Sequence, residues 1–116
     1  MKTIGVIGAG SWGTALAITL SNQGHQVKMC DVNMDHVKEM QAYRENVRYL
    51  PGIKFCDNLQ IVESTEEALA GADIALFSAP AQHFRSAFEK AIPFLEDDMV
   101  VVNVAKGIEQ GTLMRM

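Results

Sequence analysis

The feature that most constrains this chain is a glycine-rich turn that follows a short apolar run near the N-terminus. Gly8, Gly10 and Gly13 have the spacing G-x-G-x-x-G, and residues 4–7 before them are apolar. In such a turn the first glycine permits a tight change of direction, and the second lets the backbone approach a pyrophosphate closely. The third lets the following helix pack tightly on the sheet. The spacing therefore predicts a strand, a turn and a helix in succession.

The residues after the turn complete a strand–turn–helix–strand unit. Residues 12–20 form an apolar run of helix length that Gly24 ends, and residues 26–30 alternate polar and apolar side chains as a strand does. Asp31 ends that strand, where an acidic side chain can hydrogen-bond an adenosine ribose. The unpaired N–H groups at the start of the helix, and its positive dipole end, face the phosphates. The order predicts a dinucleotide site, and the alternative is a packing turn without a ligand.

Composition and charge exclude several classes of partner. The chain has 116 residues, of which 48% are hydrophobic and 21% charged, and its formal net charge is -4. This balance is typical of a globular domain, and it provides no basic face for nucleic acid or for an anionic membrane. Cys30 and Cys56 have neither metal-ligand nor disulfide-framework spacing, which favours small apolar roles in a reducing compartment.

The N-terminal apolar stretch superficially resembles a secretory signal. Four glycines and Ser11 interrupt its apolar core within residues 5–13, and the strand–turn–helix interpretation uses each of them. No run approaches the ~18 apolar residues of a membrane span. We therefore expect a cytoplasmic protein with no nucleic-acid or membrane partner.

Helices and strands alternate along the rest of the chain. The pattern predicts further helices over residues 32–42, 64–70 and 82–91, and further strands over residues 59–62, 73–79 and 99–105. Residues 43–58 are expected to form a polar loop. The alternation predicts an α/β fold of the Rossmann type, doubly wound, with a mainly parallel sheet in the order 3-2-1-4-5, helices on both faces and a single domain over residues 1–116.

Capping signals mark two of these helices. Asn33 or Asp35 can cap the helix after the second strand, and Ser64 and Glu67 have the spacing of a capping box. On the inner side of the first of these helices we expect Met34, Val37 and Met40.

The remaining charged residues leave two interpretations open. Arg44 and Arg48 can meet a phosphate bidentately, yet a charged loop exposed to water explains them equally well. His25 and His36 are expected to be solvated polar positions.

Three longer motifs resemble those of one enzyme family. They are Gly8-Ala-Gly-Ser-Trp-Gly-Thr-Ala15, Asn46-Val-Arg-Tyr-Leu-Pro-Gly-Ile53 and Val104-Ala-Lys-Gly-Ile-Glu109. Together they resemble the N-terminal half of NAD(P)-dependent glycerol-3-phosphate dehydrogenase over essentially the whole chain. The hydroxyisobutyrate and phosphogluconate dehydrogenases share the glycine turn but are not expected to show the other two motifs.

The resemblance implies a reaction and a set of contacts. The reaction is reversible hydride transfer between a nicotinamide cofactor and C2 of glycerol 3-phosphate or dihydroxyacetone phosphate, which feeds glycerophospholipid synthesis. The resemblance also implies that Ser11 and Trp12 contact the cofactor, in addition to Gly8, Gly10, Gly13 and Asp31. Lys106 matches a lysine that lies against both nicotinamide and substrate, and a lysine at the end of a strand can stabilise a developing alkoxide. The alternative for Lys106 is a solvated loop position.

Two departures from the family refine these expectations. The members that take NADP usually carry a basic residue near position 31, whereas Asp31 would repel a 2′-phosphate, which favours NAD over NADP. The family's proton-acceptor lysine and most substrate ligands lie in a helical C-terminal domain that these residues do not contain. We therefore expect the cofactor domain of an enzyme that takes a small phosphorylated substrate and is compatible with a homodimer, with no catalytic base of its own. The alternative is a free-standing NAD(H)-sensing module.

Overall fold

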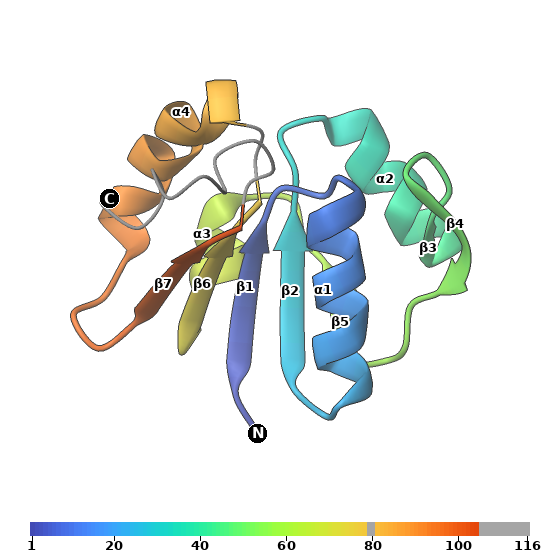
Figure 1. The fold of residues 1–116 in the computed structure, drawn as a ribbon, viewed down its shortest axis with the longest axis horizontal. Helices are drawn as coiled ribbons and strands as arrows, with labels where there is room; N and C mark the ends of the chain where they lie inside the picture. Colours follow the sequence, from blue (N-terminus) through green and yellow to red (C-terminus); the bar gives the residue numbers. More distant parts are fainter. Residues whose placement is uncertain (79–80, 105–116) are drawn as a thin grey trace.

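The computed structural model describes residues 1–78 and 81–104, and a parallel sheet of five strands forms its centre. The strands are β1 (Thr3–Ile7), β2 (Gln26–Cys30), β5 (Leu59–Ile61), β6 (Ile74–Phe77) and β7 (Val100–Asn103). Their order is β5-β2-β1-β6-β7, and every neighbouring pair is parallel. Counted along the chain, this is the predicted 3-2-1-4-5, and the carboxyl ends of the strands lie along one edge (Figure 1).

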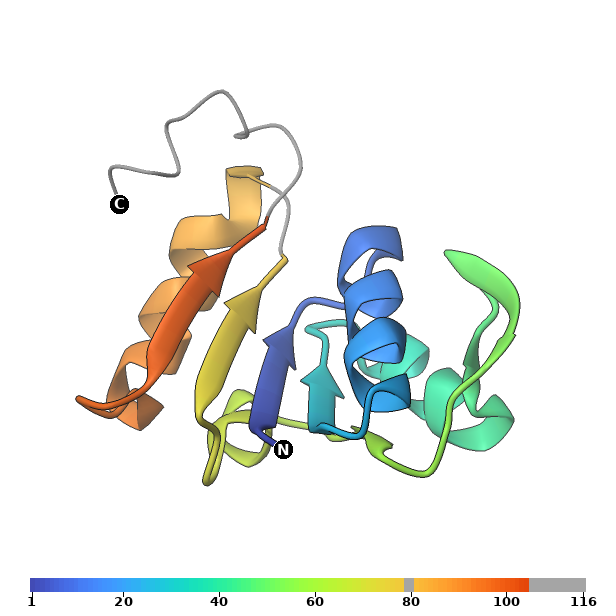
Figure 2. The ribbon, with the colours of Figure 1, turned by 60° about the horizontal axis from the view of Figure 1, so that its bottom comes forward.

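Helices cover both faces of the sheet (Figures 1 and 2). They are α1 (Ser11–Asn22), α2 (Met34–Tyr43), α3 (Thr65–Leu69) and α4 (Ala81–Ala91), and a 3-10 turn (Ile92–Phe94) follows the last. One cluster of buried apolar side chains joins α1 and α2 to the sheet, and a second joins α3 and α4 to it. The predicted α/β fold of the Rossmann type is confirmed. Strands buried on both faces explain the continuous apolar runs in the sequence.

The two predicted caps are present. Asn33, rather than Asp35, caps α2, because its side chain accepts a hydrogen bond from the backbone N–H of His36 at 3.2 Å. Ser64 caps α3, since its hydroxyl accepts from the backbone N–H of Glu67 at 3.1 Å. The prediction of Met34 as an inner residue is wrong, because Met34 is exposed at the start of α2.

The segment expected as a polar loop contains a small antiparallel hairpin. Its strands are β3 (Glu45–Asn46) and β4 (Leu50–Lys54), which lie beside α2 (Figure 1). Arg44 adopts a left-handed backbone conformation (φ 55) that ends α2 and turns the chain into β3. The Arg44 guanidinium donates to the carbonyls of Cys56 at 2.9 Å and Leu59 at 2.6 Å, which ties the end of the hairpin to the sheet. The prediction of a loop over this whole segment is therefore wrong.

The two arginines of this segment have different surroundings. Arg44 is half-buried and fixes the backbone, whereas Arg48 is exposed and forms an ion pair with Glu39 at 2.9 Å. Neither lines the pocket described below. Both arginines thus have protein partners in place of the phosphate that one interpretation of the sequence offered them.

Candidate functional site

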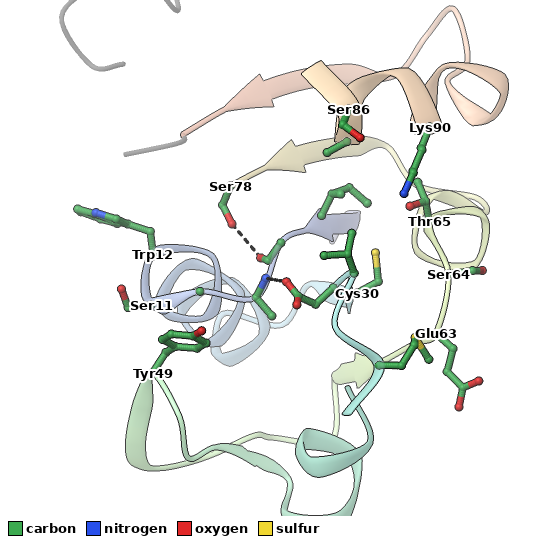
Figure 3. A pocket seen from close by; sticks show the side chains of 18 residues that line it. Ser11, Trp12, Cys30, Tyr49, Glu63, Ser64, Thr65, Ser78, Ser86 and Lys90 are labelled. Atoms are coloured by element: carbon green, nitrogen blue, oxygen red, sulfur yellow. Dashed lines mark hydrogen bonds between the residues drawn. The ribbon is translucent and has the colours of Figure 1, made fainter. Parts of the chain in front are cut away.

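A pocket of about 810 Å³ opens where the carboxyl ends of β1 and β6 lie next to each other (Figure 3). The chain leaves these two strands toward opposite sides of the sheet, so the pocket lies at the switch point where doubly wound folds bind ligands. The glycine turn and the start of α1 form one side, with Ser11 and Trp12 labelled there in Figure 3. Ser86 and Lys90 of α4 lie on the other side.

Gly8 makes the turn at the end of β1. Its φ of 110 lies in the region that glycine adopts without strain. The Gly8 N–H donates to the carbonyl of Cys30 at 2.9 Å, and its own carbonyl accepts from the Ser78 hydroxyl at 2.8 Å (Figure 3). Gly8 is thereby tied to the ends of both strands that flank β1.

Gly13 and Gly10 face different surroundings. A Cβ atom at Gly13 would collide with the Ser78 hydroxyl and with the Gly8 carbonyl, so only glycine lets α1 start this close to the turn. A Cβ atom at Gly10 would meet no described atom within 4 Å. Gly10, the second glycine of the motif, therefore leaves open space beside the turn. A ligand group that approaches the backbone closely needs such space.

The N-terminus of α1 is open to the pocket. Gly10 is the cap residue, no side chain of the described residues caps the helix, and the first turn carries no acidic side chain. Ser11 and Trp12 are exposed there, and Trp12 is 54% accessible, so Trp12 does not fill the core. Uncapped N–H groups and the positive dipole end fit an anion such as a pyrophosphate. The residues present therefore suit a dinucleotide.

Asp31 is held at the end of β2 by two backbone groups. Its carboxylate accepts from the N–H of Ala9 at 2.9 Å and from the N–H of Asn33 at 3.2 Å. Asp31 lines the pocket and is half-buried. The bonds to Ala9 and Asn33 add a second role, which is to fix the glycine turn against the end of β2.

Cys30 lies beside Asp31 in the wall of the pocket, yet its chemistry is suppressed. Burial raises the pKa of the Cys30 thiol to about 12, and a hydrogen bond with Thr65 opposes this only in part. A thiol with so high a pKa is a poor nucleophile at neutral pH. Both cysteines are free, in agreement with the predicted small apolar roles.

The second histidine contradicts its predicted place. His36 was expected to be solvated, but it is only 2% exposed, and its Nε2 lies 3.0 Å from the carbonyl oxygen of Ala9. The side-chain amide of Asn46, which is fully buried, donates to the same oxygen at 3.0 Å and to the Thr14 hydroxyl at 2.7 Å. The hairpin and α2 thus both contact the glycine turn.

Sequence reasoning missed His36, Asn46 and Ser78 as contacts of the turn. His36 immediately precedes Val37, which is buried on the inner face of α2. This position next to a buried residue was the one sequence signal that could have indicated the burial of His36. Ser78 directly follows an apolar strand, where a polar side chain reaches the strand-end edge. Lys106, the remaining predicted site residue, lies outside the described residues.

The described residues contain no cluster of three or more histidine, cysteine or acidic side chains able to hold a metal ion. In the same part of the chain, the helices are all too short or too polar to cross a membrane.

Comparison with known proteins identifies relatives over nearly the whole chain. The family described as NAD-dependent glycerol-3-phosphate dehydrogenase N-terminus matches residues 3–116. The glycerol-3-phosphate dehydrogenase (NAD(P)+) of Desulfotalea psychrophila is 44% identical over 114 residues, which are 98% of this chain and 34% of that protein. The enzyme of the same name from Syntrophomonas wolfei is 43% identical over 116 residues, again 34% of its length.

A solved structure agrees with these sequence matches. The crystal structure of glycerol-3-phosphate dehydrogenase from Coxiella burnetii matches with a TM-score of 0.88 and 34% identity, covering 95% of this chain and 34% of that one. The chain thus spans about one third of the length of the relatives it matches. It belongs to the NAD-dependent glycerol-3-phosphate dehydrogenase family and corresponds to its N-terminal, NAD(P)-binding domain.

Proposed function

We propose that this chain supplies the cofactor half of an enzyme that interconverts glycerol 3-phosphate and dihydroxyacetone phosphate in the cytoplasm. The observation that carries the proposal is the glycine turn, which leaves an uncapped helix N-terminus open to a pocket at the switch point of the sheet. When bound, the nicotinamide supplies or accepts the hydride. The residues of this chain bind and orient the cofactor through Gly8, Gly10, Ser11, Trp12, Gly13 and Asp31.

The expected cofactor is NAD rather than NADP. Asp31 places a carboxylate in the pocket wall, where it can accept from a free ribose hydroxyl and repels a 2′-phosphate. Its neighbour in the chain, Val32, is 80% exposed and offers no positive charge to a phosphate. The preference for NAD is thus supported by the negative charge of Asp31 in this part of the pocket wall.

Lys106 is proposed to contact the nicotinamide and the substrate, because its motif matches that of the family. The proton acceptor and the ligands of the substrate phosphate are proposed to come from the parts of the family enzyme outside the third that this chain spans. A small phosphorylated substrate and a homodimer belong to that complete enzyme. The relatives are named as dehydrogenases, which favours this proposal over a free-standing NAD(H) sensor.

The direct test is a calorimetric titration of the chain with NADH and with NADPH in parallel. We expect both to bind, and NADH to bind more tightly. Tighter binding of NADPH would retain the family function and overturn the argument from Asp31. Absence of binding by a chain whose circular dichroism shows the folded α/β spectrum would contradict the cofactor proposal itself. In a separate assay that supplies NAD+ as the hydride acceptor, glycerol 3-phosphate is expected to give no detectable NADH formation by these residues alone.

A further inference from the structure

Two buried side-chain donors converge on one backbone carbonyl of the glycine turn. His36 comes from α2 and Asn46 from β3, and the Nε2 of the first and the Nδ2 of the second each lie 3.0 Å from the Ala9 oxygen. The two residues are 2% and 0% exposed, so water does not compete for this oxygen. A carbonyl has two lone pairs, and the two donors occupy both.

These contacts determine the direction of the next N–H group. The described residues contain no cis peptide bond, so the N–H of Gly10 points opposite to the carbonyl of Ala9 in the same peptide plane. Because that carbonyl faces His36 and Asn46, the Gly10 N–H is directed away from the hairpin. The N–H of Ala9 is already held by the carboxylate of Asp31 at 2.9 Å. Both peptide groups that flank Ala9 are therefore fixed by side chains.

Stability alone does not explain a histidine here. The Nδ1 atom of His36 is buried without a hydrogen-bond partner in the described part of the chain. A buried polar atom without a partner is destabilising, so a phenylalanine of similar size would suit packing better. The ring of His36 also packs edge-to-face on Tyr49, with 5.3 Å between centroids, a contact that phenylalanine would keep. What phenylalanine would lose is the bond to Ala9.

We propose that His36 and Asn46 are positioning residues for the cofactor's pyrophosphate. They hold the Ala9–Gly10 peptide so that the Gly10 N–H, together with the open N-terminus of α1, faces the diphosphate. Neither side chain needs to touch the ligand. The inference rests on the proposed dinucleotide function, and it adds two residues from the hairpin and α2 that act through the backbone of the turn.

The test uses two variants and two matched controls. His36→Phe and Asn46→Ala each remove one donor to the Ala9 carbonyl. Gln41→Ala removes a side-chain bond from the same helix α2 to Ile61, and Asn58→Ala removes an asparagine bond to Ser21 at the opposite end of α1. Each variant is titrated with ADP-ribose, which carries the diphosphate, and with adenosine, which does not. Denaturant unfolding is measured in parallel.

We expect ADP-ribose to bind roughly five- to tenfold more weakly to either positioning variant, while the affinity for adenosine and both affinities of the controls stay within about twofold. The double variant should lose more than the product of the single losses, because the donor that remains in each single variant still holds the carbonyl in part. His36→Phe should keep wild-type stability, so it carries the test if Asn46→Ala unfolds. In NMR spectra, the shift of the Gly10 amide on binding ADP-ribose should shrink in both variants.

Two results would overturn the positioning role and leave the dinucleotide function intact. One is an unchanged affinity of His36→Phe for ADP-ribose. The other is an equal loss for adenosine and ADP-ribose, which would indicate general loosening of the pocket. A wild-type chain that binds neither ligand would overturn the positioning role together with the proposed function.

Discussion

The three glycines of the turn are chemically identical, yet their surroundings assign them different tasks. Gly8 needs its positive φ, Gly13 needs the absence of a Cβ atom to pack against Ser78, and Gly10 borders empty space. We therefore expect fold and ligand binding to depend on different members of one short motif. Alanine substitutions separate the two.

Gly10→Ala is expected to impair binding without unfolding the chain. The extended backbone of Gly10 (φ -79, ψ -166) suits any residue, and the added Cβ meets no described atom, so the free energy of unfolding should change by less than about 1 kcal/mol. The methyl group would occupy the space that the pyrophosphate approaches. NADH affinity should fall roughly ten- to a hundredfold, as a clash of about 1–3 kcal/mol implies. Calorimetry and denaturant unfolding measure the two effects.

Gly13→Ala provides the opposite control. The added Cβ would displace the Gly8 carbonyl and break its bond with Ser78. We expect the free energy of unfolding to fall by on the order of 2 kcal/mol, because these losses outweigh the ~1 kcal/mol that alanine gains over glycine inside a helix. Wild-type stability of this variant would show that the turn relaxes easily, and would weaken the division of tasks between the glycines.

The charge of Asp31 can be tested with asparagine, which has nearly the same shape. Asp31→Asn removes the negative charge and keeps one oxygen, which can accept from the Ala9 N–H, while the bond from the Asn33 N–H to the second oxygen is lost. Two like charges near a protein surface repel by about 1 kcal/mol or more at about 4 Å, so the ratio of NADPH to NADH affinity should rise at least roughly fivefold. Asp35→Asn, which removes an exposed charge from the first turn of α2, should leave the ratio unchanged. Parallel titrations measure both ratios.

At the scale of elements, sequence reasoning succeeded where periodicity is local. The apolar runs of β1 and β6 and the capping signal at Ser64 each lie within a few residues, and all three predicted elements are present. The β3–β4 hairpin was missed because distant partners hold it, such as the guanidinium of Arg44 on the carbonyl of Leu59. The inward orientation of His36 was missed for the same reason. Its partner Ala9 lies 27 positions earlier in the chain.

The hairpin should loosen in acid. The backbone N–H of Gly52 donates to the Glu45 carboxylate at 2.8 Å, and this bond, followed by the interaction with Lys54, lowers the pKa of Glu45. A lowered pKa means that the ionised carboxylate stabilises the folded hairpin above the ordinary glutamate pKa of about 4.3, and that this contribution is lost as the pH falls through the folded value. The Gly52 amide resonance should therefore titrate at a pH below about 4.3.

Glu45→Gln is the matched control for this titration. The glutamine oxygen can still accept from the Gly52 N–H, so the hairpin should persist while its acid-dependent step disappears. A Gly52 amide that titrates in this variant as in the wild type would show that another acid governs the hairpin.

At the scale of the whole molecule, the two apolar clusters on opposite faces share one sheet, so each depends on the other. Ile4 and Val6 of β1 belong to the cluster that joins α1 and α2 to the sheet. Ile7, which directly follows Val6, belongs to the other cluster together with Cys30. Because each strand has side chains on both faces of the sheet, loss of packing in one cluster also weakens the strands that hold the other cluster. We therefore expect the described residues to unfold as one cooperative unit rather than face by face.

The Cys30 thiol can report on this cooperativity. It is 3% exposed and burial raises its pKa to about 12, so at pH 8 a disulfide reagent should modify Cys30 only when the chain opens. The half-buried Cys56 is first replaced by alanine, so that Cys30 is the single thiol. If unfolding is global, the free energy of opening obtained from the labelling rate should equal the free energy of unfolding obtained with denaturant. The slope of the free energy of opening against denaturant concentration should then equal the equilibrium m-value. Labelling through an opening with a much smaller slope would instead show that Cys30 becomes accessible when the cluster that joins α3 and α4 to the sheet opens locally, without global unfolding.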